Sequence, residues 1–110
     1  MSASLRKEGY HVAVFHDLHG LLRLARSVVR GETPAPDLVI LDRALPDGDG
    51  CYALSFMRAL GLDIPVVLAT THPSPATVVL AHSLGAAEVL SKPFSLGQLR
   101  SLVGRLAPPA

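Results

Sequence analysis

The sequence has little of several features that would mark it as a special class of protein. It contains one cysteine, no tryptophan, and ten Lys and Arg residues against nine Asp and Glu residues. A lone cysteine, Cys51, can form neither an internal disulfide nor a multi-cysteine metal site, so we interpret it as a packing residue. The near balance of charge supplies no positive field for phosphate backbones, which disfavours nucleic-acid binding by this domain alone.

Long hydrophobic segments are also missing. The longest uninterrupted apolar run, Ile64–Ala69, is far shorter than the roughly 18 residues that a membrane-spanning helix needs. The segment Met1–Gly9 lacks the apolar core of a secretory signal peptide. We therefore expect a cytosolic (cytoplasmic) location and no association with a membrane.

The residues that are present suit one compact domain. Hydrophobic residues make up 49% of the chain and charged residues 17%. This composition supports a buried core without disulfides or metals. Domains usually have roughly 100 to 150 residues, so we predict a single domain over residues 1–110.

Short apolar runs alternate regularly with helical patterns along the chain. We predict strands at His11–Phe15, Asp37–Leu41, Ile64–Ala69 and Glu88–Leu90, and helices at about Leu18–Arg30, Cys51–Leu60, from Pro75 to Gly85, and Leu96–Leu106. Consecutive apolar and β-branched residues in the second and third strands are typical of strands buried on both faces. The alternation predicts a doubly wound parallel α/β sheet.

The N-terminal segment departs from this alternation. Ser2–Glu8, followed by Gly9, has the pattern of the last turns of a helix with its C-terminal glycine, and no strand precedes it. The sequence therefore predicts a chain that begins inside a β-α-β unit. The alternative is a short frayed helix that opens a complete fold.

Polar side chains follow three of the predicted strands. Asp42 ends the second strand, Thr70 and Thr71 end the third, and the fourth continues through Ser91 into Lys92. Because parallel strands end at one edge of the sheet, where ligands bind, we expect Asp42, Thr70 and Lys92 to share a pocket. The compact ammonium group of a lysine suits a single phosphoryl oxygen, and Thr70 can donate a hydrogen bond to the same group.

Four segments resemble the receiver domain of bacterial two-component response regulators in order and spacing. They are Pro36–Asp42, Leu45–Gly50, Ile64–Thr70 and Gly85–Phe94, and the resemblance extends over about residues 5–106. It implies a flavodoxin-like fold with strand order 2-1-3-4-5, here without its first strand.

The resemblance also implies roles for single residues. Asp42 corresponds to the aspartate that accepts a phosphoryl group from a histidine kinase or phosphotransfer protein, and Thr70 and Lys92 correspond to the residues that bind this group. Asp42 and the backbone carbonyl of Ala44 correspond to Mg²⁺ ligands, and Lys92–Pro93 to a peptide bond that is usually cis. The implied reaction is in-line phosphoryl transfer to a carboxylate, so the domain is a self-catalysing phosphoacceptor and not a conventional enzyme.

Two departures from the family pattern affect these expectations. The family binds Mg²⁺ partly through an acidic pair at the end of its first strand, which this sequence lacks, so we expect weak metal binding and weak phosphorylation. Val89 stands at the switch position where the family usually has Tyr or Phe, and a valine cannot make the same rotation.

Other functions remain open at this stage. The runner-up is a degenerate receiver that binds other proteins without phosphorylation. An aspartate-nucleophile phosphatase is disfavoured because that class needs a second aspartate where Ala44 stands. The pair His16 and His19 is far more typical of surface or packing histidines than of a metal site, and we interpret Asp47–Gly50 as a turn and not a calcium loop.

The absent first strand also leads to a prediction about assembly. In the implied order it is the central strand, so His11–Phe15 and Asp37–Leu41 would face each other across a gap of about 9.6 Å. Each unpaired backbone group in a core costs about 1 to 3 kcal/mol, so such a gap cannot persist. Either the two strands pair directly or a second chain supplies strands, and we favour the homo-oligomer.

Overall fold

A computed structural model of the chain describes residues 2–7 and 10–106. Its strands are β1 (Ser2–Lys7), β2 (Tyr10–Phe15), β3 (Leu38–Asp42), β4 (Ala44–Leu45), β5 (Gly48–Asp49), β6 (Val66–Thr70) and β7 (Glu88–Ser91). Its helices are α1 (Leu18–Val29), α2 (Gly50–Ala59), α3 (Pro75–Ser83) and α4 (Leu96–Leu106). Among the helices of these described segments, none has the length and apolar content to cross a membrane.

The main sheet has the order β1-β2-β3-β6-β7, and β4 and β5 form a separate small hairpin. The pairs β2–β3, β3–β6 and β6–β7 are parallel, and β1 pairs with β2 in antiparallel orientation. The parallel part has the order expected from the resemblance with its central strand left out. The predicted α/β fold with a parallel sheet is therefore confirmed.

The N-terminal prediction was wrong. Ser2–Lys7 is a strand and not the end of a helix, and its register pairs Lys7 with Tyr10 and Ser2 with Phe15. Glu8 and Gly9, the other residues of that prediction, lie outside the described residues. The backbone groups along the outer edge of β2 need hydrogen-bond partners, and pairing with β1 satisfies them, which overrides local helix propensity.

Of the two outcomes expected for the absent central strand, the structure shows the direct pairing of the flanking strands. β2 pairs directly with β3, with Val12 opposite Leu38 and Phe15 opposite Leu41. The strands have closed up because a buried row of unpaired N–H and C=O groups would cost more than repacking. The direct pairing removes the reason from which we expected an oligomer.

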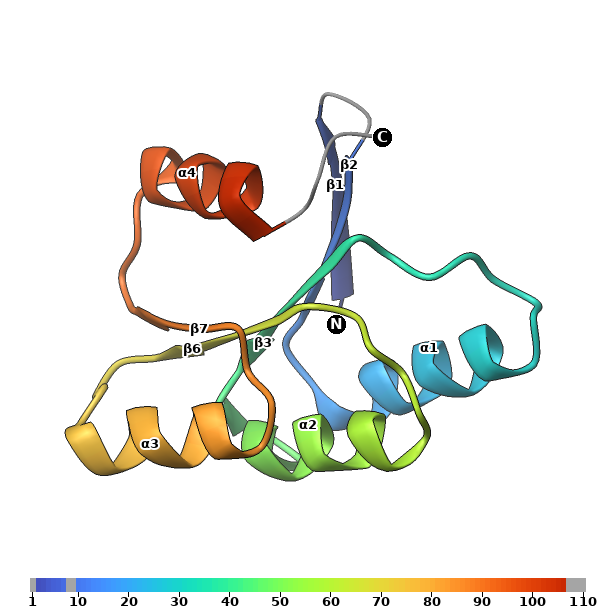
Figure 1. Ribbon diagram of the computed structural model, residues 1–110, viewed down its shortest axis with the longest axis horizontal. Helices are drawn as coiled ribbons and strands as arrows, with labels where there is room; N and C mark the ends of the chain where they lie inside the picture. Colours follow the sequence, from blue (N-terminus) through green and yellow to red (C-terminus); the bar gives the residue numbers. More distant parts are fainter. Residues whose placement is uncertain (1, 8–9, 107–110) are drawn as a thin grey trace.

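Two helical layers cover the parallel strands (Figure 1), with α1, α2 and α3 on one face and α4 on the other. Side chains of each strand alternate between the two faces. The core beneath α1, α2 and α3 includes Ala13, Phe15, Val39, Leu41, Val66, Leu68, Leu21, Leu54, Met57 and Ala81. The core beneath α4 includes Val12, Leu38, Ile40, Val67, Ala69, Leu90, Leu102 and Val103. Each residue of Leu38–Leu41 is at most 2% exposed, as predicted for a strand buried on both faces.

The helix boundaries follow local capping signals. The Asp17 side chain accepts a hydrogen bond from the Gly20 N–H at the start of α1, and Ser95 and Gln98 form a reciprocal capping box at the start of α4. Gly31, just beyond α1, has a φ of 74°, which a residue with a side chain rarely adopts. These signals mark where α1 and α4 begin and where α1 ends.

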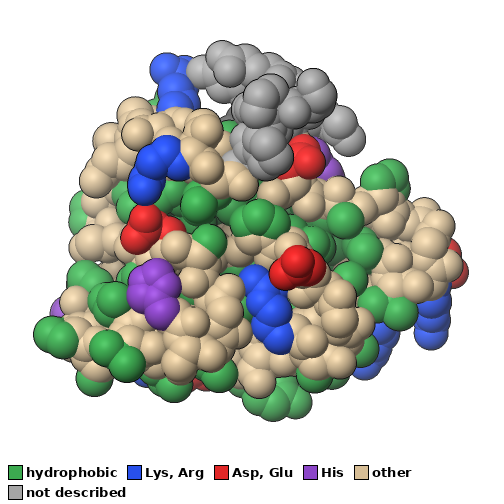
Figure 2. All heavy atoms as spheres, in the orientation of Figure 1, with side chains coloured by type: hydrophobic (Ala, Val, Ile, Leu, Met, Phe, Trp, Pro, Cys, Tyr) green, Lys and Arg blue, Asp and Glu red, His purple; other side chains and the backbone are tan. Residues whose placement is uncertain are grey.

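The surface carries charges of both signs. On the face shown in Figure 2, Lys and Arg side chains lie among Asp and Glu side chains, without a large patch of one sign on that face. This distribution agrees with the net charge of +1.

Candidate functional site

Asp42 lies at the carboxyl end of β3 and contacts two nitrogen-bearing side chains. Its Oδ1 is 2.5 Å from Nζ of Lys92, which follows β7. Its Oδ2 is 2.8 Å from Nδ1 of His16, which follows β2. The Asp42 side chain is only 13% exposed, whereas those of Lys92 and His16 are 33% and 53% exposed. The site is thus a nearly buried carboxylate with one nitrogen group on each oxygen.

The parallel sheet brings these three residues together. Phe15 and Leu41 are paired across β2 and β3, so the next residues, His16 and Asp42, emerge side by side at the same edge. Asp42 and Lys92 were expected here from the sequence, whereas His16 was expected to be a surface or packing histidine. The available signal was its position directly after a strand, the same criterion that selected the other residues.

The two contacts on Asp42 oppose the effect of its burial. Burial raises the pKa of the Asp42 carboxyl, but the hydrogen bonds from Lys92 and His16, together with the positive charge of Lys92, outweigh it, so the pKa lies below its usual value. Asp42 is therefore ionised at neutral pH. An ionised carboxylate is the form that can act as a nucleophile.

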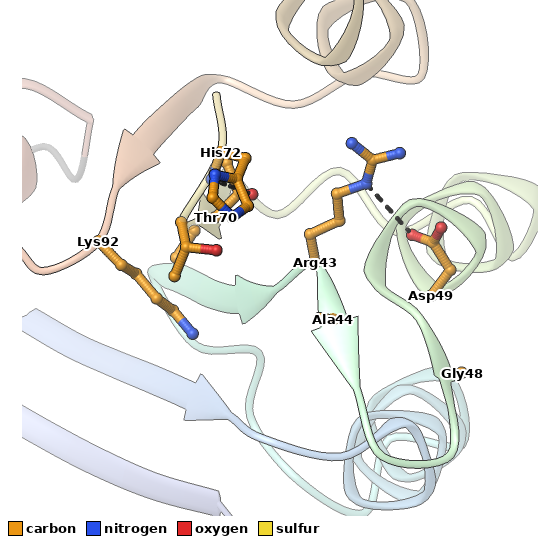
Figure 3. A pocket seen from close by; sticks show the side chains of 9 residues that line it. Arg43, Ala44, Gly48, Asp49, Thr70, His72 and Lys92 are labelled. Atoms are coloured by element: carbon orange, nitrogen blue, oxygen red, sulfur yellow. Dashed lines mark hydrogen bonds and ion pairs between the residues drawn. The ribbon is translucent and has the colours of Figure 1, made fainter. Parts of the chain in front are cut away.

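A cavity of about 350 Å³ lies beside Lys92, and Asp42 is not among its lining residues. Its lining includes Thr70 and Lys92 on one side and Arg43 and Asp49 on the other (Figure 3). Thr70 is 8% exposed, and its hydroxyl accepts a hydrogen bond from the backbone N–H of His72. Of the three residues predicted to share a pocket, Thr70 and Lys92 line this cavity, and Asp42 is linked to it through its ion pair with Lys92.

The loop after β3 lines part of the cavity. β4 and β5 pair as a short hairpin with Ala44 opposite Asp49, and Ala44 lines the cavity. The backbone of Gly50 approaches β3 so closely that an added Cβ would lie 2.3 Å from the carbonyl oxygen of Asp42. A hydrogen bond from the Gly50 N–H to the Arg43 carbonyl closes the loop. Glycine at this position is therefore needed for the loop to pack against Asp42.

Asp47, at the tip of this hairpin, has a role that the sequence analysis missed. Its carboxylate accepts hydrogen bonds from the backbone N–H groups of Leu18 and His19, at 2.7 and 3.0 Å. The bond from Leu18 is the main cause that lowers the pKa of Asp47. The segment Asp47–Gly50 thus belongs to a hairpin, which connects the site loop to the start of α1.

Arg43 links the other side of the loop to α3. Its Nη1 donates to the hydroxyl of Thr77 at 2.5 Å, and Thr77 is 5% exposed. Nε of Arg43 also lies 4.0 Å from the Asp49 carboxylate. The residue after Asp42 is therefore tied to a helix that starts beyond β6.

The remaining residues singled out in the sequence have structural surroundings. Val89 on β7 is half-buried and packs against the core beneath α1, α2 and α3. Cys51 is buried, and burial raises the pKa of its thiol, as suits a packing residue. The Lys92–Pro93 peptide bond is cis, as the resemblance implies.

The donor set around Asp42 does not suit Mg²⁺. Magnesium requires six oxygen ligands, usually including one or two carboxylates. Both oxygens of Asp42 contact nitrogen groups, and in the described part of the chain no three His, Cys, Asp or Glu side chains gather as a metal site. Ala44 can offer its backbone carbonyl at the cavity wall, but the family's acidic pair has no counterpart among these contacts.

Comparisons with known proteins identify the family to which the chain is similar. Residues 1–104 match the family model of the response regulator receiver domain. The KDP operon transcriptional regulatory protein KdpE of Escherichia coli is 36% identical over 78 residues, which are 71% of this chain and 34% of that protein. The response regulator MprA of Mycolicibacterium vanbaalenii is 33% identical over 109 residues, which are 96% of this chain and 45% of that protein. The chain thus spans less than half the length of these relatives.

Solved structures show the same fold. The beryllofluoride-activated NtrC4 receiver domain dimer has a TM-score of 0.65 and 26% identity, with 87% of this chain and 93% of that chain covered. A DNA-binding response regulator of the LuxR family from Staphylococcus aureus has a TM-score of 0.68 and 22% identity, with 83% and 70% covered. The latter likeness concerns the fold alone.

Proposed function

Because this chain belongs to the response regulator receiver domain family of two-component systems, we propose that Asp42 is its phosphoacceptor. The observation that carries the proposal is the ion pair between Asp42 and Lys92, 2.5 Å apart at the carboxyl edge of the sheet. The phosphoryl donor is a histidine kinase or a phosphotransfer protein. The alternative, a degenerate receiver that works without phosphorylation, has no specific observation in its favour.

The proposed reaction is an in-line transfer to a carboxylate. One oxygen of Asp42 forms a bond to phosphorus while the bond between phosphorus and the donor breaks, and the donor leaves with the electron pair. Lys92 neutralises charge on the incoming group, and Thr70 donates a hydrogen bond to it from the cavity wall. The cavity of about 350 Å³ has room for a phosphoryl group.

Receiver domains generally bind Mg²⁺ at the phosphorylation site. We propose that this chain binds it weakly or not at all, because its donor set lacks the acidic pair. Without the charge of the metal, transfer to Asp42 is expected to be slow.

Incubation with acetyl phosphate, followed by intact-mass measurement, tests the proposal. We expect a gain of about 80 Da, the mass of one phosphoryl group, that Asp42→Asn abolishes. Asp63→Asn is the matched control, because Asp63 is exposed and lines a different cavity beside Ile64 and Pro65. Labelling that persists in Asp42→Asn would place the acceptor elsewhere, and no labelling of the unaltered chain would favour the degenerate receiver.

A further inference from the structure

The position of His16 depends on the closed sheet. In the implied family order a central strand would separate β2 from β3, but here β2 pairs directly with β3. The end of β2 therefore lies where the end of that central strand, with its acidic pair, is expected. His16 occupies this position and contacts Asp42 directly.

The direction of the hydrogen bond between His16 and Asp42 follows from the charge of the carboxylate. An ionised carboxylate can only accept hydrogen bonds, so Nδ1 of His16 carries the hydrogen and donates it to Oδ2 of Asp42. A neutral imidazole can do this in one tautomer and an imidazolium can do it always, so the contact needs no change of protonation. Lys92 holds the other oxygen, and each carboxylate oxygen keeps a further lone pair for attack on phosphorus.

We propose that His16 takes the place of the divalent cation at this site: its Nδ1–H holds Asp42 and the developing acyl phosphate, so that phosphorylation of Asp42 depends on His16 and not on Mg²⁺. This inference rests on the proposed function. With acetyl phosphate as donor, the new bond joins an Asp42 oxygen to phosphorus, the bond from phosphorus to the acetate oxygen breaks, and acetate leaves with the electron pair. This transfer of the phosphoryl group needs no proton and no further reactant.

The exposure of the two side chains is compatible with this role. Asp42 is nearly buried and His16 is half exposed, so the imidazole lies between the carboxylate and solvent. The Nδ1–H of His16 fixes the orientation of the Asp42 carboxylate, and positioning of the reacting groups supplies a large part of the catalysis of phosphoryl transfer. His16 is thus a hydrogen-bonding residue of the acceptor site and no longer only a surface histidine.

The test compares labelling by acetyl phosphate in EDTA and in Mg²⁺, with the whole 110-residue chain and intact-mass detection. We expect initial rates that differ by less than about twofold between the two conditions. His16→Ala should lower the rate by roughly tenfold or more, and His16→Asn, whose amide nitrogen can replace Nδ1, should recover part of it. His19→Ala is the matched control, because His19 is exposed and the bond it makes to Asp47 uses only its backbone N–H.

A second measurement does not depend on phosphorylation. His16→Asp restores one carboxylate beside Asp42, so titration calorimetry should detect Mg²⁺ binding to this variant and none to the unaltered chain. Labelling that occurs only with Mg²⁺, or that is unchanged in His16→Ala, would overturn the inference and leave Asp42 as the phosphoacceptor. Absence of labelling under both conditions would overturn the proposed function itself, and the role of His16 with it.

Discussion

Phe15 lies opposite Leu41 in the parallel register of β2 and β3. This pairing places the residues that follow, one on each strand, in hydrogen-bond contact at the edge of the sheet. It also provides hydrogen-bond partners for the backbone groups along the facing edges of β2 and β3, which otherwise would need strands from a second chain. The same register therefore decides which residues meet at the site and allows β2 and β3 to pair without strands from a second chain.

The first prediction concerns assembly. Because β2 and β3 pair directly, the 110-residue chain does not need to exchange strands with a second copy. We expect light scattering at micromolar concentration to give a mass near 11.6 kDa. A stable dimer at this concentration would restore the strand-sharing oligomer that the sequence first suggested.

The second prediction concerns the close approach of the site loop. An added Cβ at Gly50 would lie 2.3 Å from the backbone oxygen of Asp42 and 2.9 Å from Cα of Arg43. We expect Gly50→Ala to lower the free energy of unfolding by about 1 to 3 kcal/mol and to slow labelling of Asp42, because the loop must shift. Urea unfolding measures the stability change.

Gly104→Ala is the control for this substitution. Gly104 is exposed within α4, and an added Cβ there meets nothing within 4 Å. Alanine in a helix interior is more favourable than glycine, so we expect stabilisation by up to about 1 kcal/mol. Equal effects of the two substitutions would contradict the steric explanation for Gly50.

The third prediction concerns pH and Asp47. Backbone hydrogen bonds from Leu18 and His19 lower the pKa of Asp47 in the folded chain. A carboxyl with a lowered folded-state pKa contributes stability above its unfolded pKa of about 3.9, and loses that contribution as pH falls through the folded value. We expect Asp47→Ala to unfold at lower urea than the unaltered chain at pH 7, with the difference shrinking below about pH 4.

Asp47→Asn separates the charge from the hydrogen bonds. Asparagine keeps an acceptor for one N–H group but has no charge that depends on pH in this range. Its urea midpoint should lie between those of the unaltered chain and Asp47→Ala at pH 7. A difference between Asp47→Ala and the unaltered chain that stays constant down to pH 3 would argue against an ionised cap.

The fourth prediction concerns the link between the site loop and α3. Thr77→Val removes the hydroxyl that accepts from Arg43 and keeps the shape of the side chain. We expect a loss of about 1 kcal/mol in the free energy of unfolding. In a double-mutant cycle with Arg43→Met, a coupling energy of at least about 0.5 kcal/mol is expected, and strictly additive effects would show that the two side chains do not support each other.

The sequence by itself determined the elements of the parallel sheet and most of the site. The apolar residues of Leu38–Leu41 predicted a doubly buried strand, and the helical pattern of Leu96–Leu106 predicted the last helix. Asp42 and Lys92 could be found because parallel strands end at a common edge, so their place along the chain already implies their place in space. Each of these features depends only on the residues of a single helix or strand, or on the direction in which parallel strands run.

Only the tertiary structure decided which strands are neighbours. The pairing of β2 with β1 and β3 depends on backbone hydrogen bonds between distant segments, which side-chain periodicity does not encode. For the same reason the helix predicted at Ser2–Glu8 proved to be a strand over Ser2–Lys7. The contact of His16 with Asp42 and the cap that Asp47 provides for α1 join residues 26 to 29 positions apart. Such contacts form only once β2 and β3 are paired, so the sequence could place His16 at the end of a strand but could not show that it contacts Asp42.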